Sequence, residues 1–356
     1  MSDNSEQKAQ YQRRRALFLR VAAGLATAAA LALFLVAFNL MNQTQSTELQ
    51  ASDTTGLNHG AVSDVEQAKV EAPPLATFVA IEPRSALESI SWEPQAEYGR
   101  DGLLFAGYDT EALLSENALE AVVASTTALE EAGNSVGFVL LDLNTGLGLA
   151  YHTDLDFYSA SSIKGPYVAA DIAAYPEDFS PYELSIEAIL VDSNNDVYES
   201  FYMRRLDEPL DEWYDRAGVD LNNNNPMYPY YSPRELGLLW LETYDFLSSD
   251  APYAAELAGY YSYPANSVLH SQLDWRGATW SKAGWYAFYE QYDGFTTSPS
   301  ACDAGIIFAE GHPYLLVLMC DCPGNLAALY DLANSLDVVH QELSELGPEA
   351  LSSLMG

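Results

Sequence analysis

The order in which strand-like and helix-like segments follow one another constrains the fold of this chain most. Periodic hydrophobic residues predict a helix, two strands joined by a tight turn, a long and mostly helical stretch, three strands and a final helix. The segments are residues 115–133, 135–142, 147–152, 162–267, 276–282, 303–308, 314–319 and 325–346. A chain that leaves a sheet, forms a helical lobe and returns predicts an α/β (α+β) domain, with an antiparallel sheet flanked by helices and an inserted all-helical lobe. The cleft between sheet and lobe is the expected site.

The N-terminal region predicts a membrane anchor followed by a linker. Residues 1–20 form a basic cytoplasmic tail, and residues 21–41 carry no charge, a length that can cross the roughly 30 Å core of a bilayer. The first basic residue after the apolar run is Lys69, so the remainder is expected outside the cytoplasm. A cleaved signal peptide is the alternative, but no small-x-small site follows the run, which favours a transmembrane signal anchor. Residues 42–95 predict a flexible stalk, and residues 96–348 one folded domain.

Composition excludes several classes of function. The formal net charge is −36 over 356 residues, which argues against nucleic-acid binding because phosphate contacts need lysine and arginine. The histidines are scattered and no Cys-x-x-Cys pair exists, so we expect no metal and no cofactor. The segment 192–196 has the first spacings of a calcium loop but lacks the glycine and glutamate that complete one. No feature predicts an oligomeric state.

A serine and a lysine stand three positions apart where a strand pattern gives way to a helical one, in the segment FYSASSIK at residues 157–164. On the first turn of a helix, positions i and i+3 share one face, so the Lys164 amine can reach the Ser161 hydroxyl. A lysine can activate a serine as a nucleophile when burial or a nearby cation lowers its pKa. The alternative is an ordinary helix start with a serine cap and an exposed lysine.

Two further motifs favour the chemical interpretation. Ser193-Asn194-Asn195 lies in the helical stretch, and Lys282-Ala283-Gly284 ends the first returning strand. The chain has only four lysines, and Lys164 and Lys282 are the two that follow the stalk. An acidic surface with so few lysines has little reason to keep one in each motif for solvation alone.

In this order, and on these elements, the three motifs resemble the S-x-x-K, S-D-N and K-T-G set of class A β-lactamases and penicillin-binding proteins. The resemblance covers about residues 115–346 and implies a serine hydrolase. Ser161 would be the acylated nucleophile and Lys164 its base. Ser193 would relay a proton to the leaving nitrogen, and Asn195 would bind the substrate amide. Lys282 would hold the substrate carboxylate and lower the pKa of Lys164.

The same resemblance places the oxyanion hole at the backbone N–H of Ser161 and an N–H of the strand after Gly284. Three departures from the family motifs weaken the resemblance. Asn194 replaces aspartate, Ala283 replaces a threonine that contacts the substrate carboxylate, and residues 207–231 lack the glutamate motif that activates the deacylating water. The main hypothesis is a membrane-anchored, extracytoplasmic serine hydrolase that acts through a Ser161 acyl-enzyme on a β-lactam or a D-Ala-D-Ala-like cell-wall peptide. Without the glutamate, the acyl-enzyme should be long-lived. A weak or inactive penicillin-binding or wall-peptide-binding module of the same fold is the alternative.

The cysteines and a pair of arginines complete the sequence predictions. Pairing the last two strands about their turn puts Cys302 opposite Cys320 or Cys322, which predicts one cross-strand disulfide outside the cell and one odd thiol. Arg204-Arg205 either bind an anion or lie on a solvated helix face, and the second interpretation is favoured.

Overall fold

The computed structural model describes residues 82–90, 99–107, 110–219, 225, 227–291 and 295–345. The predicted basic tail, the membrane anchor and the stalk as far as residue 81 lie outside the described residues. Among the helices of the described part, none is both long and apolar enough to cross a bilayer.

The domain is built around an antiparallel sheet of six strands in the order β1-β3-β2-β10-β9-β6. Its strands are β1 (Leu103–Ala106), β2 (Val136–Asp142), β3 (Gly148–Tyr151), β6 (Thr279–Tyr286), β9 (Ser300–Ala309) and β10 (His312–Cys320). The hairpin β9–β10 pairs with β2, so the two ends of the chain share one sheet. Two short ribbons lie outside it: β4 (Phe157–Tyr158) with β5 (Tyr230–Tyr231), and β7 (Glu290–Gln291) with β8 (Thr296–Thr297).

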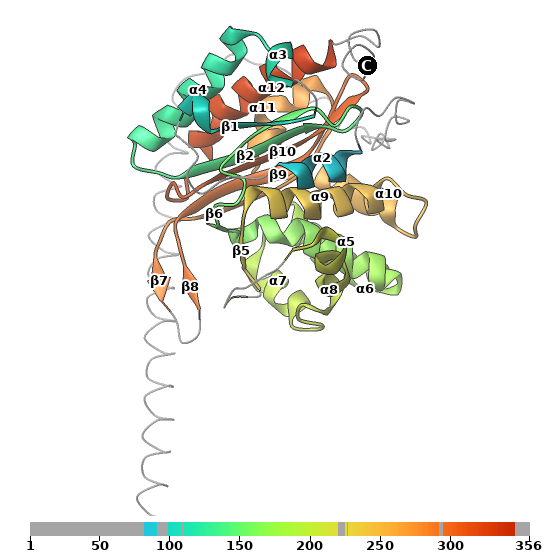
Figure 1. Ribbon diagram of the computed structural model, residues 1–356. Coiled ribbons are helices and arrows are strands. Elements are labelled where there is room, and N and C mark those ends of the chain that lie inside the picture. The colour runs from blue at the N-terminus through green and yellow to red at the C-terminus, as the bar shows by residue number, and fades with distance from the viewer. Residues whose placement is uncertain are drawn as a thin grey trace, which may run out of the picture. The chain divides into compact units, whose positions relative to one another are not determined.

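Helices cover both faces of the sheet (Figure 1). One face carries α3 (Thr110–Leu113), α4 (Glu116–Glu131), α11 (Val268–Leu273) and α12 (Tyr330–Ser344). The other face is covered by α2 (Pro83–Ser89) and α9 (Pro233–Leu247). Beyond these two helices lies the lobe, which consists of α5 (Lys164–Ala174), α6 (Phe179–Leu190), α7 (Asn195–Tyr202) and α8 (Glu208–Ala217), with α10 (Ala254–Tyr261) beside them. Short 3₁₀ turns are η1 (Gly99–Gly102), η2 (Ala160–Ile163), η3 (Pro176–Asp178), η4 (Asp274–Arg276) and η5 (Leu326–Leu329). The predicted sheet with an inserted helical lobe is confirmed.

A hydrophobic core lies on each face of the sheet. Because successive side chains of a strand point to opposite faces, Leu315 and Val317 of β10 join the core on the lobe side, whereas Leu316 and Leu318 join the core under α4 and α12. With both faces covered, the central strands read as continuous hydrophobic runs rather than as an alternating pattern.

Local sequence signals set the starts of several helices. Ser115 caps α4, and Ser232 forms a capping box with Glu235 at the start of α9. Pro166 does not interrupt α5, because it stands in the first turn of the helix, where its missing N–H has no helical partner in any case.

The structure corrects two predicted boundaries. Residues 83–89, assigned to the stalk, form α2, in which Ala86 and Leu87 are fully buried in the core. The sequence predicts the first returning strand at residues 276–282, whereas β6 runs over Thr279–Tyr286. Gly284 therefore lies within the strand and not at its end.

The predicted cysteine pairing is wrong by one residue. In the register of β9 and β10, Cys302 lies opposite Met319, and Cys320 lies opposite Ala301. Cys302 therefore faces the lobe, while Cys320 and Cys322 belong to the core on the other face. All three cysteines are buried and free.

Candidate active site

Ser161 lies on a tight turn between β4 and α5. Ala160, the residue before it, adopts a positive φ of 44°, which is rare for a residue other than glycine and typical of a backbone held in place by its surroundings. The backbone N–H of Lys164 donates to the carbonyl of Ser161, so the two residues stand one turn apart as predicted. Ser161 is half-buried, and Lys164 is fully buried.

The Lys164 amine is held by the second motif. Its Nζ donates to the backbone carbonyl of Ser193 at 2.8 Å and to Oδ1 of Asn195 at 2.6 Å. Burial, and then the charge of Lys282, lower the pKa of Lys164 to about 6. A neutral amine has two N–H donors and one lone pair. With both donors used, the lone pair is left as a proton acceptor.

The second motif holds an unusual loop conformation. Ser193 has a positive φ of 58°, and Asn194 caps α7 by accepting the backbone N–H of Val197 at 3.0 Å. Asparagine caps a helix as well as aspartate does, which accounts for one of the departures from the S-D-N pattern. The turn thereby directs both the carbonyl of Ser193 and the side chain of Asn195 at Lys164.

Lys282 joins the third motif to the second. Its Nζ donates to Oγ of Ser193 at 2.9 Å and to the carbonyl of Ala283 at 2.8 Å. Burial lowers the pKa of Lys282 to about 7, and the buried carboxylate of Asp303 opposes that shift. The side chain of Ala283 lies opposite Asp303 in the register of β6 and β9, so Ala283 supplies its carbonyl to this site.

Gly284 brings β6 against the turn that carries the nucleophile. A Cβ at this position would lie 2.4 Å from the backbone nitrogen of Ser162, 2.5 Å from the carbonyl oxygen of Ser159 and 2.7 Å from the backbone nitrogen of Ser161. The strand and the turn therefore meet backbone to backbone, which is the arrangement an oxyanion hole of two N–H groups requires.

The structure thus brings together Ser161, Lys164, Ser193, Asn195, Lys282 and Gly284. Sequence reasoning missed Tyr198, whose ring centroid lies 5.3 Å from the Lys164 amine and which is completely buried. Its position one turn after Asn195 on α7 is the signal that could have identified it. Burial and Lys282 account for the lowered pKa of Lys164. Asp220 of the following loop lies outside the described residues.

No cluster of three or more histidine, cysteine, aspartate or glutamate side chains that could hold a metal ion occurs among the residues that the structure describes.

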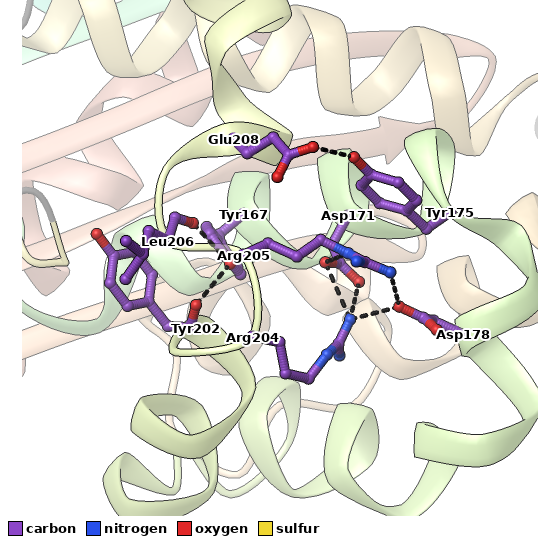
Figure 2. Close-up of polar contacts among 9 residues, drawn as sticks. All are labelled: Tyr167, Asp171, Tyr175, Asp178, Tyr202, Arg204, Arg205, Leu206 and Glu208. Atoms are coloured by element: carbon purple, nitrogen blue, oxygen red, sulfur yellow. Dashed lines mark hydrogen bonds and ion pairs between the residues drawn. The ribbon is translucent and has the colours of Figure 1, made fainter.

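A partly buried ionic cluster joins the helix of Lys164 to the turn that follows the helix of Asn195 (Figure 2). Asp171 of α5 and Asp178 of η3 accept from Arg204 at 3.0 and 2.5 Å, and Arg205 donates to Asp178 at 2.6 Å. Both arginines follow the end of α7. The solvated helix face predicted for them is therefore wrong. The guanidinium of Arg204 also lies 4.0 Å from the ring centroid of Phe201, and this contact further restricts the turn.

We expect Asp171→Ala to lower the free energy of unfolding by about 1–3 kcal/mol, since it leaves partly buried arginines without one of their two carboxylates. Asp171 is 0% exposed and Arg204 is 16% exposed. Glu212→Ala is the matched control, because Glu212 is 81% exposed beside Arg216 and such pairs contribute less than about 1 kcal/mol. Urea unfolding of both variants measures the difference, and equal losses would contradict a buried clamp.

Known structures resemble this arrangement of elements. A β-lactamase from Sphaerobacter thermophilus is similar with a TM-score of 0.52 and 14% identity, over 64% of this chain and 98% of that chain. PBP-A is similar with a TM-score of 0.51 and 16% identity, over 64% of this chain and 97% of its own. The chain has the β-lactamase/penicillin-binding-protein fold. No protein-family model and no curated protein matches the sequence.

Within the β-lactamase/penicillin-binding-protein fold, the candidate residues come from three separate parts of the chain. Ser161 and Lys164 lie at the start of α5, Ser193 and Asn195 at the start of α7, and Lys282 on the edge strand β6. A further similar structure is a PBP-A variant that was solved as an acyl-enzyme complex with penicillin G, with a TM-score of 0.50 and 16% identity over 64% of this chain and 97% of that chain.

Proposed function

We propose that this protein is a serine hydrolase that forms an acyl-enzyme at Ser161 with a β-lactam or a D-Ala-D-Ala-like cell-wall peptide. The observation that carries the proposal is the hydrogen bonding of Lys164. Both N–H donors of its neutral amine are used by Ser193 and Asn195, and the lone pair remains one helical turn from Ser161. That is the arrangement of a general base, not of a solvated lysine.

The acylation step follows from these contacts. Ser161 Oγ attacks the substrate carbonyl carbon as its proton passes to Lys164, and a tetrahedral intermediate forms with its oxyanion facing the N–H groups of the turn and β6. The C–N bond then breaks. The leaving nitrogen takes a proton from Ser193 Oγ, and the protonated Lys282 that donates to this hydroxyl replaces it, while Lys164 keeps the proton of Ser161. An ester remains on Ser161. Lys282 orients the Ser193 hydroxyl at 2.9 Å.

Deacylation requires a water molecule and a base to activate it. The sequence between α8 and α9 lacks the glutamate motif of class A β-lactamases. The ester on Ser161 should therefore persist. This supports penicillin binding or wall-peptide chemistry over rapid β-lactam hydrolysis.

The N-terminal sequence supports a location outside the cytoplasm, where cell-wall peptides occur. We propose a single-pass signal anchor at residues 21–41 with the hydrolase domain extracytoplasmic. Fractionation of cells expressing the full chain, followed by protease treatment of intact cells, tests this. If the protease leaves the hydrolase domain uncut in intact cells, this location is contradicted.

The first test is intact-mass analysis of the full chain in detergent after incubation with benzylpenicillin, beside Ser161→Ala. We expect a stable adduct with the full mass of the penicillin on the native protein and none on the variant. Loss of penicillin from solution without an adduct would reveal a fast β-lactamase and contradict slow deacylation. An adduct on Ser161→Ala would place the nucleophile elsewhere.

A binding module of the same fold is the second candidate, because Asn194 and Ala283 depart from the enzyme motifs. The cap that Asn194 supplies weakens this argument, since the loop retains its geometry with asparagine. Turnover or acylation that Lys164→Ala abolishes would exclude the module. Binding of a wall peptide without any acylation would favour it.

A further inference from the structure

A buried aromatic ring lies beside the Lys164 amine, in addition to the two oxygens that accept its hydrogen bonds. The Nζ atom stands over the ring of Tyr198, 5.3 Å from its centroid. A cation within about 6 Å of a ring centroid is attracted by the electrons of the ring face. Tyr198 lies one turn after Asn195 on α7 and belongs to none of the three motifs. The resemblance therefore assigns this residue no role.

Other side chains hold the ring of Tyr198 in its place. Tyr167 of α5 packs edge-on against it with ring centroids 5.5 Å apart, and Tyr228 packs on it at the same distance. The Tyr198 hydroxyl donates to the carbonyl of Met227 at 3.3 Å. A completely buried ring with these contacts stays beside the amine when the charge of the amine changes.

The ring is a neutral partner of Lys164. Burial raises the pKa of Tyr198 well above its usual value, and it raises the pKa of Tyr167 and Tyr228 as well. The three phenols therefore keep their protons near neutral pH. Any attraction between Tyr198 and a protonated Lys164 comes from the electrons of the ring and not from a phenolate.

The charged groups around the amine do not favour a positive charge on it. Lys282 of β6 faces Lys164 and, after burial, is the second cause of its lowered pKa. Asp303 of β9 acts on Lys282, and Asp171 of α5 acts on Tyr167. When Lys164 takes a proton, the contact with the ring is thus an attraction in surroundings that oppose the new charge.

We propose that Tyr198 is a positioning residue whose ring stabilises the positive charge that Lys164 acquires as it takes the proton of Ser161. This inference rests on the proposed Ser161 acyl-enzyme and deepens it. The O–H bond of Ser161 breaks as its oxygen attacks the substrate carbonyl, and the proton forms a new N–H bond with the lone pair of Lys164. The resting amine is neutral and gains little from the ring, whereas the ammonium gains more. A contact that is stronger in the transition state than in the ground state raises the rate of acylation.

The test changes the electrons of the ring and keeps its shape. Tyr198→Phe removes the hydroxyl alone, and replacement of Tyr198 by pentafluorophenylalanine reverses the charge distribution on the ring face. Because the chain has only four lysines, the Cε signal of Lys164 can be followed by NMR of the full chain in detergent with carbon-13 lysine, and assigned with Lys164→Met. We expect the fluorinated ring to lower the pKa of Lys164 by about 0.5–1.5 pH units relative to Tyr198→Phe.

Acylation by benzylpenicillin, followed by intact mass, supplies the second measurement. The fluorinated ring should slow acylation severalfold at pH 7 relative to Tyr198→Phe, because the amine is then a weaker base. The loss should be smaller at pH 5, where the weaker base is also less protonated. A general distortion of the site would slow the reaction equally at both pH values and would contradict the inference.

The matched control makes the same replacements at Tyr202, which packs on Tyr198 with ring centroids 6.1 Å apart and lies one turn further along α7. A fluorinated ring at this position should leave the titration of Lys164 unchanged. 4-Fluorophenylalanine at position 198, which withdraws fewer electrons, should give a smaller shift in the same direction. This graded series keeps the test decisive if the most fluorinated chain does not fold.

The outcomes separate the inference from the proposed function. If Lys164 titrates alike with phenylalanine and with the fluorinated rings at position 198, the inference is overturned while the acyl-enzyme stands. An equal shift from the fluorinated ring at Tyr202 would overturn it too, because the effect would then belong to the aromatic cluster as a whole. If the native chain forms no adduct at Ser161 although the titration shifts as expected, the proposed function fails and the contact between ring and amine is supported.

Discussion

Lys164→Met should reduce the acylation of Ser161 by benzylpenicillin at least 10³-fold and leave the protein folded. Methionine fills the space of the lysine stem but has no lone pair that takes a proton at neutral pH. General-base catalysis contributes about 10²–10⁴-fold, and the loss of the amine that Ser193 and Asn195 hold should remove that contribution. The measurement is the rate of adduct formation by intact mass, beside thermal unfolding as a check of the fold. A folded variant that acylates within tenfold of the native rate would show that Lys164 is not the base.

The pH dependence of the native protein tests the same assignment without a mutation. Lys164 acts as a base only when neutral, and burial with Lys282 lowers its pKa to about 6, so the acylation rate should rise between pH 5 and 7. Lys282 is expected to act while protonated, and burial lowers its pKa to about 7, so the rate should fall above that pH. The profile is then a narrow bell whose two limits belong to the interacting pair. A rate that climbs steadily to pH 10 would mean an unperturbed lysine.

The free energy of unfolding should also depend on pH because the pKa of Lys164 is lowered. The unfolded chain keeps the proton of Lys164 up to a pH near 10.5, while the native state releases it near pH 6. Between these values the unfolded state binds more protons, so the free energy of unfolding should rise with pH. In Lys164→Met this contribution is absent, and the rise over pH 6–8 should be less steep than in the native protein.

The element order was predictable because each element carries its own local signal. Ser115 and the Ser232–Glu235 pair mark helix starts, and Asn144-Thr145-Gly146 marks the turn between β2 and β3. These signals depend on neighbours within four residues, which a sequence displays directly. The motif residues were found for a related reason: Ser161 and Lys164 are one turn apart, so their proximity is visible without the tertiary structure.

The errors concern contacts between distant segments. Helix α2 has few turns and weak periodicity, and only its burial against β2 and α9 identifies it as part of the domain. The sequence alone suggests that Arg204 and Arg205 face solvent, because it does not show that α5 packs beside the end of α7. A shift of one residue in the β9–β10 register put Cys302 opposite the wrong partner, because strand pairing reverses the face of every side chain with each step.

The convergence of Lys164 and Lys282 on one serine is likewise a property of the tertiary structure. The motifs predicted that both lysines belong to the site, but not that both would be almost completely buried or that one would donate to the carbonyl and the other to the hydroxyl of Ser193. Those two contacts explain how one residue in a positive-φ turn can position two amines.

Gly284→Ala should abolish acylation and destabilise the domain. The added methyl would lie 2.4–2.7 Å from three backbone atoms of the turn at residues 159–162, and backbone atoms cannot move aside as the end of a side chain can. Strand β6 must therefore separate from the turn, which opens the proposed oxyanion hole. A displacement of about 1 Å costs on the order of 10² in rate, the loss of an oxyanion donor costs about 10²–10³, and overpacking costs about 1–3 kcal/mol of stability.

Gly259→Ala is the matched control, because nothing lies within 4 Å of a Cβ at this position of α10. Alanine favours a helix interior by about 0.5–1 kcal/mol over glycine, so this variant should be slightly more stable and should acylate at the native rate. Intact-mass kinetics and urea unfolding of the two variants separate a general intolerance of alanine from the contact at β6. If Gly284→Ala acylates like Gly259→Ala, then β6 does not press on the turn of Ser161, and the oxyanion hole cannot lie between them.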